Sequence, residues 1–101
     1  MPGPGGFAVQ VLMIGLLKPG SADEVARLQP DFTQHLEQPL LRIRAAGALR
    51  DEKGLETGFM ILLETDSLQS ARAYFDSDPF LDDGLYDQVH FMEFATEAGR
   101  F

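Results

Sequence analysis

The sequence predicts an α+β fold whose elements follow the order β-α-β-β-α-β, with a four-stranded antiparallel sheet and both helices on one face. Three observations predict it. The length of 101 residues suits a single domain. Apolar, β-rich segments alternate with amphipathic ones, and turn residues separate them. Hydrophobic residues make up 45% of the chain, an ordinary globular value that argues against disorder.

Composition sets the expected boundaries of the domain. Residues 1–6 read MPGPGG and predict a flexible Pro/Gly arm. All patterned segments fall within residues 7–96, which we expect to form one domain, followed by a short tail over 97–101. The arm lacks the basic segment of a secretory signal, and the apolar run after it is too short to span a membrane.

Each expected strand is an apolar, β-rich run bounded by turn residues. The turn Lys18-Pro19-Gly20 closes the first run, and Asp51-Glu-Lys-Gly54 separates the second from the third. The four strands are expected over residues 7–17, 48–50, 58–65 and 86–94.

A long helical stretch is expected after the first strand. Ser21 and Glu24 have the spacing of a capping box, which places the start of the helix at Ser21. The helical pattern continues to Ala46, and Gly47 suits the stop position that follows a helix.

Two prolines complicate this helical stretch. Pro30 fits the first turn of a second helical segment better than a helix interior. Pro39 should bend the segment or break it. The apolar stripe of the stretch consists of Phe32, Leu36, Leu40 and Ile43.

The second helix is expected to start at a cap formed by Asp66 or Ser67 and to end near Phe75. Its buried face should contain Leu68, Ala71 and Phe75. With this helix the order of elements is that of the ferredoxin-like split motif.

The expected sheet is apolar on both faces. In a sheet with one solvated face, apolar and polar residues alternate along each strand. Here both alternating sets are apolar in the first and third strands: Val9, Val11, Met13, Phe59, Ile61 and Leu63 in one, Leu12, Ile14, Met60 and Leu62 in the other. Because two helices cover one face only, we expect a second copy of the chain to cover the other, as a homodimer.

Charge and cysteine content exclude several classes of function. The formal charge is −8, and the cations are not clustered, so we expect neither nucleic acid nor an anionic membrane as a partner. The chain has no cysteine, which removes disulfides, thiolate nucleophiles and Cys-based metal sites. The cytoplasm is the default expectation for localisation. The arginines are scattered: Arg27, Arg42, Arg44, Arg50, Arg72 and Arg100.

The second half of the chain carries a recognisable series of motifs. It contains a helix over 67–75, then Asp78-Pro79-Phe80, Gly84-Leu85-Tyr86 and Glu93-Phe94. This series resembles the YciI-related (YCII-related) family of the dimeric α/β-barrel superfamily, and the resemblance covers residues 9–94. It implies a sheet-to-sheet dimer and a pocket in which a histidine of the first helix lies beside the aspartate of the Asp-Pro turn.

The aspartate of that pair matches Asp78, and the histidine has two alignments. His35-Leu36 resembles the His-Leu pair of the family. If the match is anchored on Pro30 instead, Phe32 takes the position of the histidine. A carboxylate beside an imidazole raises the histidine pKa toward neutrality, which suits acid–base catalysis. Alternatively, His35 is an ordinary helix residue and Asp78 only forms a turn with its own backbone.

Three further residues are expected to bind substrate: Phe80, Tyr86 and His90. Tyr86 begins the last strand and has a hydroxyl that can reach a ligand, although packing at the sheet edge also explains it. His90 is better explained as a core or interface histidine. The aspartates around the Asp-Pro turn lack the order of a calcium loop, so no metal site is expected.

The hypothesis that follows is a small cofactor-independent enzyme. The resemblance implies lyase, isomerase or dehydrochlorinase chemistry on a small carboxylate or ring compound, with His35 and Asp78 as the acid–base pair. The alternative is a non-catalytic dimeric module that binds a ligand or assists another protein. A monooxygenase on the same fold is supported by analogy alone.

Overall fold

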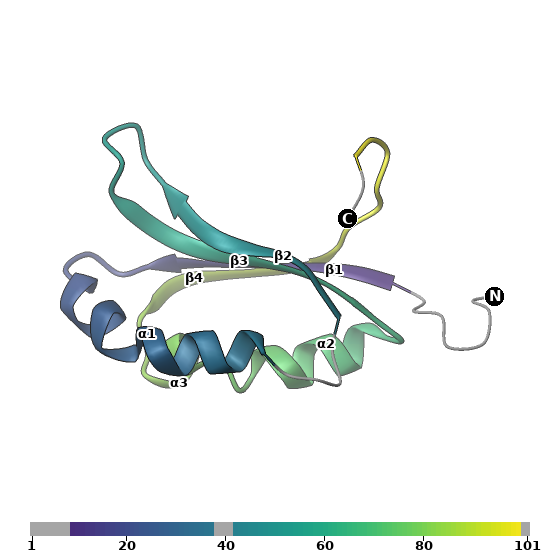
Figure 1. The fold of residues 1–101 in the computed structure, drawn as a ribbon, viewed down its shortest axis with the longest axis horizontal. Coiled ribbons are helices and arrows are strands. Elements are labelled where there is room, and N and C mark those ends of the chain that lie inside the picture. The colour runs from purple at the N-terminus through teal and green to yellow at the C-terminus, as the bar shows by residue number, and fades with distance from the viewer. Residues whose placement is uncertain (1–8, 38–41, 100–101) are drawn as a thin grey trace.

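A computed structural model of the chain describes residues 9–37 and 42–99 (Figure 1). Four antiparallel strands form one sheet in the order β2-β3-β1-β4, and the helices lie on one face of it. The predicted ferredoxin-like α+β fold is confirmed. The elements are β1 (Val9–Leu17), α1 (Ala22–Leu36), β2 (Arg42–Arg50), β3 (Glu56–Thr65), α2 (Leu68–Phe75), α3 (Pro79–Asp82) and β4 (Tyr86–Glu93).

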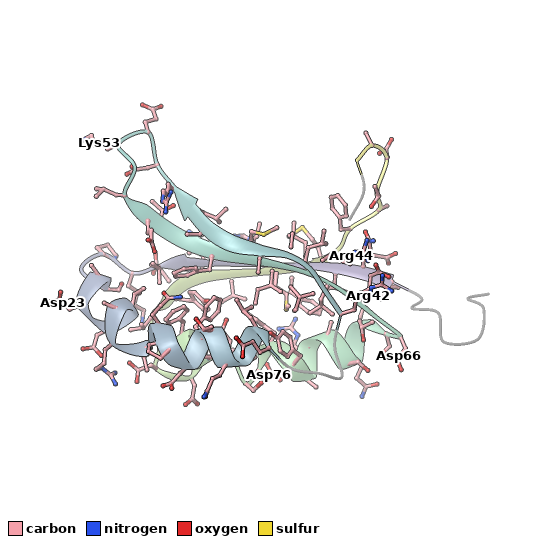
Figure 2. All side chains as sticks on the ribbon, in the orientation of Figure 1. Asp23, Arg42, Arg44, Lys53, Asp66 and Asp76 are labelled. Carbon is pink, nitrogen blue, oxygen red and sulfur yellow. The ribbon has the colours of Figure 1, made fainter. Side chains whose placement is uncertain are left out.

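The core lies between the sheet and the helices, where side chains fill the space (Figure 2). Alternate residues of β1 and β3 point toward the helices, as the period of two along a strand requires. The sheet contributes Val11, Met13, Phe59, Ile61 and Leu63, and the helices contribute Val25, Leu28, Phe32, Ala71, Phe75 and Phe80.

The expected helix to Ala46 is wrong, because α1 ends at Leu36 and β2 occupies Arg42–Arg50. The prediction followed the apolar stripe as far as Ile43 and took Gly47 as a helix stop, but both residues belong to β2. Pairing of β2 with β3 along nearly its whole length overrides the helical pattern. The connection around Pro39, like the arm over 1–6, lies outside the described residues.

The predicted break at Pro30 and the predicted capping-box bonds are also wrong, although Ser21 does occupy the predicted N-cap position of α1. Pro30 lies inside one continuous helix. It has no N–H to donate to the carbonyl of Ala26, but both residues are exposed, so water can bind that carbonyl. Ser21 forms no side-chain cap. Its hydroxyl donates to the carbonyl of Lys18, while Glu24 pairs with Arg27 instead of reaching back.

For α2, the predicted cap is confirmed, but one of the residues predicted for its buried face is exposed. Ser67 caps α2, since its side chain accepts a hydrogen bond from the Ser70 N–H at 3.1 Å. Leu68 was expected to be buried but is 44% exposed. The Asp-Pro turn begins an additional helix, α3. Pro79 lies in its first turn, where the missing N–H of a proline costs no helical hydrogen bond.

The face of the sheet opposite the helices is largely apolar. Cross-strand register places Leu12 opposite Leu62 and Ile14 opposite Met60 on this face. A half-buried ion pair, Arg44 Nε to Glu64 Oε1 at 3.1 Å, lies at one side of it. Within the described residues no helix is long and apolar enough to cross a membrane.

Candidate functional site

The Asp78 side chain is fully buried at the junction of α2, α3 and β4. Pro79 holds Asp78 in an extended conformation, so its carboxylate caps α3. Its Oδ1 accepts a hydrogen bond from the Phe80 N–H at 2.8 Å, and its Oδ2 accepts one from the Tyr86 hydroxyl at 2.9 Å. The carboxylate is therefore fixed by two directional bonds.

A glycine in β1 makes room for the tyrosine that holds Asp78. Gly15 packs directly against the Tyr86 ring, and a Cβ atom at position 15 would collide with it. Because Gly15 has no side chain, the Tyr86 ring can pack directly against the backbone of β1.

Asp78 has no cationic partner, because none of the salt bridges among the described residues involves it. Burial raises the pKa of Asp78, and the hydrogen bonds from Phe80, Tyr86 and the Leu81 backbone counteract this only in part. Burial also raises the pKa of Tyr86, and the Asp78 charge adds to that shift. A buried, unpaired carboxylate beside a protonated phenol is typical of groups that transfer protons.

His35 lies in the same layer, on the buried side of α1. Its ring stacks on Tyr74 with the centroids 4.1 Å apart and the planes 3° from parallel. The Tyr74 hydroxyl donates to the backbone carbonyl of His35 at 2.7 Å. The buried Nε2 of His35 has no hydrogen-bond partner among the described residues. Burial lowers the pKa of His35, so the ring is neutral at pH 7 and Nε2 is free to accept or donate according to the tautomer.

His35 and Asp78 are not hydrogen bonded to each other, since the Asp78 oxygens bond to Phe80 and Tyr86 while His35 Nε2 is unpartnered. Tyr74 links the two electrostatically. Its ring covers His35, and the Asp78 charge contributes to raising its pKa after the larger effect of burial.

The other residue considered for the histidine position, Phe32, is also buried on α1. Its ring stacks on Phe80 with centroids 4.6 Å apart and lies 5.2 Å from the ring of Phe59. Phe32 and His35 are three residues apart and so share one face of the helix. The aromatic stack fills the space beside Asp78.

His90 lies apart from this cluster. It pairs with Ile14 on the opposite face of the sheet from the helices, is exposed, and has Nε2 3.4 Å from Gln88 Oε1. Phe80 and Tyr86, by contrast, both adjoin Asp78.

The remaining aspartates of the corner have structural positions. Asp76 is the C-cap residue of α2 and Asp82 ends α3, while Asp83 pairs with Arg27 at 3.3 Å. Among the described residues no three His, Asp or Glu side chains gather as metal ligands.

Sequence reasoning missed Tyr74 and Gly15. Tyr74 lies four residues before Asp78, but α2 ends at Phe75 and Asp78 is extended, so helical spacing gives no signal for this pair. The role of Gly15 depends on the register between β1 and β4, which no local pattern reveals.

Comparisons with known proteins support the fold. No family model matches the chain, and no curated protein matches it. Among solved structures, the 5-chloro-2-hydroxyhydroquinone dehydrochlorinase of Burkholderia phenoliruptrix, in complex with 2,5-dihydroxybenzoquinone, superposes with a TM-score of 0.75 at 21% identity. The match covers 85% of this chain and 93% of that one.

Two other solved structures share the arrangement more loosely. A protein from Pseudomonas aeruginosa matches with a TM-score of 0.57 at 13% identity, over 95% of this chain and 100% of its own. A conserved protein from Methanosarcina mazei matches with a TM-score of 0.54 at 15% identity, over 90% and 94%. At these identities the likeness concerns the fold.

Proposed function

We propose that this chain is a YciI-like, cofactor-independent enzyme that moves protons on a small ring compound or carboxylate. The observation that carries the proposal is Asp78, a fully buried carboxylate with a raised pKa and no cation beside it. A buried carboxylate without a cation costs stability when it is charged, so Asp78 is a candidate for proton transfer in addition to its role as the cap of α3. The shared fold of a dehydrochlorinase with a bound ring compound agrees with this proposal.

In the proposed reaction His35 and Asp78 divide the proton transfer. A neutral His35 accepts a proton from the substrate through Nε2, which has no competing partner. Asp78, held by Tyr86, orients the substrate or stabilises the positive charge that develops on the imidazole. Phe80 and Tyr86 would contact the substrate ring. On a chlorinated hydroxyquinol, one phenolic proton moves to the carbon that bears chlorine, and removal of a second phenolic proton then expels chloride and forms the quinone, with net loss of HCl.

One observation favours the second candidate, a non-catalytic binding or accessory module. The stack of Phe32 on Phe80 fills the space beside Asp78, and catalysis requires a substrate to displace part of it. A module that keeps this fold without the chemistry would retain the packed arrangement.

The test is release of chloride from 5-chloro-2-hydroxyhydroquinone and related chlorinated phenols, compared with buffer alone. His35→Asn and Asp78→Asn should each lower the rate by about 10²–10⁴-fold, the range for loss of an acid–base group. Asp76→Asn changes an exposed carboxylate two residues before Asp78 and should leave the rate unchanged. Saturable binding without turnover would favour the accessory module, and equal loss in all three variants would remove the assigned roles.

We further infer that the apolar face of the sheet is covered by a second copy of the chain. Leu12, Ile14 and Met60 lie there, and burying apolar area stabilises by roughly 25 cal/mol per Å². Ile14→Glu should therefore give a monomer in size-exclusion chromatography with light scattering. Leu68→Glu, at an exposed position of α2 on the other side of the sheet, should leave the dimer intact. A monomeric wild type would refute the dimer.

A further inference from the structure

A groove separates α1 from the hairpin that joins β2 and β3. Its wider part, about 880 Å³, extends from the turn after β1 along the first half of the helix. A narrower cleft of about 280 Å³ continues it, and the two share Gln29 and Glu56. Figure 1 shows the hairpin curving away from the helical layer at this end of the sheet. We call the two clefts together the α1 groove.

Small residues create the space. One wall is the face of α1 that carries Ala22, Val25, Ala26 and Gln29, which recur at spacings of three and four. The narrower part is bordered by Ala46 and Ala48, whose short side chains lie on the helix-facing side of β2, opposite Ile61 and Phe59. The volume falls in the range of small-molecule sites, about 300–1,000 Å³.

Several polar side chains of the groove already have partners within the protein. The Ser21 hydroxyl donates to the Lys18 carbonyl, and the Thr57 hydroxyl donates to the Leu49 carbonyl at 3.3 Å. The Asp51 carboxylate accepts from two backbone N–H groups of its own turn, at 2.8 and 3.0 Å.

The polar side chains left for a ligand are Lys18, Gln29 and Glu56, which form no ion pair or side-chain hydrogen bond within the described residues. The two acids, Asp51 and Glu56, outnumber the single cation. Together with a formal chain charge of −8, this disfavours an anion. Glu56 accepts hydrogen bonds, so it suits a hydroxyl or another donor on the ligand.

Apolar contacts define the rest of the ligand. Leu55, at the hairpin, borders the groove and is 63% exposed, so a bound apolar molecule would cover it. In the narrower cleft the lining includes Phe32 and Phe59, whose ring centroids lie 5.2 Å apart. An aromatic ring bound here would lie against these two rings.

We propose that the α1 groove binds a flat, mostly apolar molecule that carries a hydrogen-bond donor and no negative charge. This site goes beyond the proposed acid–base chemistry, because neither His35 nor Asp78 lines it. The groove does reach Phe32, and the Phe32 ring stacks on the ring of Phe80. A molecule in the groove would therefore be separated from Phe80 by the Phe32 ring.

The experiment is titration of ¹⁵N-labelled protein with three probes that differ only in the polar group: 2-naphthol, 2-methoxynaphthalene and 2-naphthoate. We expect saturable shifts of the backbone amides of Ala22, Ala26 and Leu55 with 2-naphthol. Binding of 2-naphthoate should be at least about fivefold weaker, since the groove carries net negative charge. Glu56→Gln should weaken 2-naphthol by about threefold or more and leave 2-methoxynaphthalene unchanged.

Ala26→Phe fills the groove from an exposed position and should abolish the shifts, whereas Ala73→Phe, exposed on α2, should not. Asp78→Asn should still bind 2-naphthol, which separates failure of this site from failure of the proposed chemistry. Shifts centred on Leu12 and Ile14, equal binding of all three probes, or undiminished binding to Ala26→Phe would each overturn the proposal.

Discussion

Asp78→Ala is expected to lower the free energy of unfolding by about 2–4 kcal/mol. Loss of the cap on α3 costs about 1 kcal/mol. Loss of the acceptor leaves the Tyr86 hydroxyl without its partner, which costs about 1–3 kcal/mol for a buried group. Chemical denaturation at pH 7 measures the change.

Asp78→Asn separates the hydrogen bonds from the charge. Asparagine has nearly the same shape as aspartate, and its one amide oxygen can still accept from the Phe80 N–H or from Tyr86. The buried negative charge is removed. We therefore expect Asp78→Asn to be at least as stable as the wild type at pH 7. Asp76→Asn, which changes an exposed carboxylate two residues earlier, should alter stability by less than about 0.5 kcal/mol.

The pH dependence follows from the sign of the Asp78 shift. The folded protein holds the Asp78 proton more tightly than the unfolded chain, whose carboxyl has its ordinary pKa of 3.8. The contribution of this group to stability is therefore complete below pH 3.8 and is lost as the pH rises through the raised folded pKa. Asp78→Asn should gain stability relative to wild type across that window. A difference that stays constant from pH 3.5 to 8 would show that Asp78 is not perturbed.

The sheet could be predicted from the sequence because its strongest strands have an unambiguous pattern. The apolar runs that form β1 and β3 pair with each other along their length at the centre of the sheet. The sequence does not predict the first part of β2, because Leu40 and Ile43 continue the apolar spacing of the helix and Gly47 suits a helix stop. The strand conformation of β2 comes from pairing with β3, a contact distant in the sequence.

The candidate site was only partly predictable for a related reason. Asp78 could be identified from the Asp-Pro turn, which is a local feature of the chain. Its actual partner, Tyr86, depends on how β4 pairs with β1, including a shift of register near Leu17. The stacking of Tyr74 on His35 joins α2 to α1 and has no local signature either.

Gly15→Ala is expected to destabilise the domain by about 1–3 kcal/mol, the usual cost of inserting atoms into a packed site. The new methyl group would collide with the Tyr86 ring and push its hydroxyl away from Asp78. Gly47→Ala is the matched control, since it adds the same group to another strand where no described atom of the same chain lies within 4 Å. Because Gly47 pairs with Met60 on the proposed dimer face, both variants are compared in the Ile14→Glu background. Gly47→Ala should be neutral, or stabilise by about 0.4–1 kcal/mol through the unfolded state.

A double-mutant cycle with Tyr86→Ala assigns the Gly15 effect to the tyrosine. If the ring is the cause, Gly15→Ala should cost almost nothing once the ring is absent, and the coupling energy should equal most of the single-variant cost. Strain in β1 itself would persist in the Tyr86→Ala background and would contradict this origin. The same cycle bears on chemistry: in Gly15→Ala the carboxylate of Asp78 loses the phenol that holds it while His35, on α1, keeps its stack on Tyr74. Lower activity in a folded Gly15→Ala protein would therefore trace to the position of Asp78 and not to the histidine.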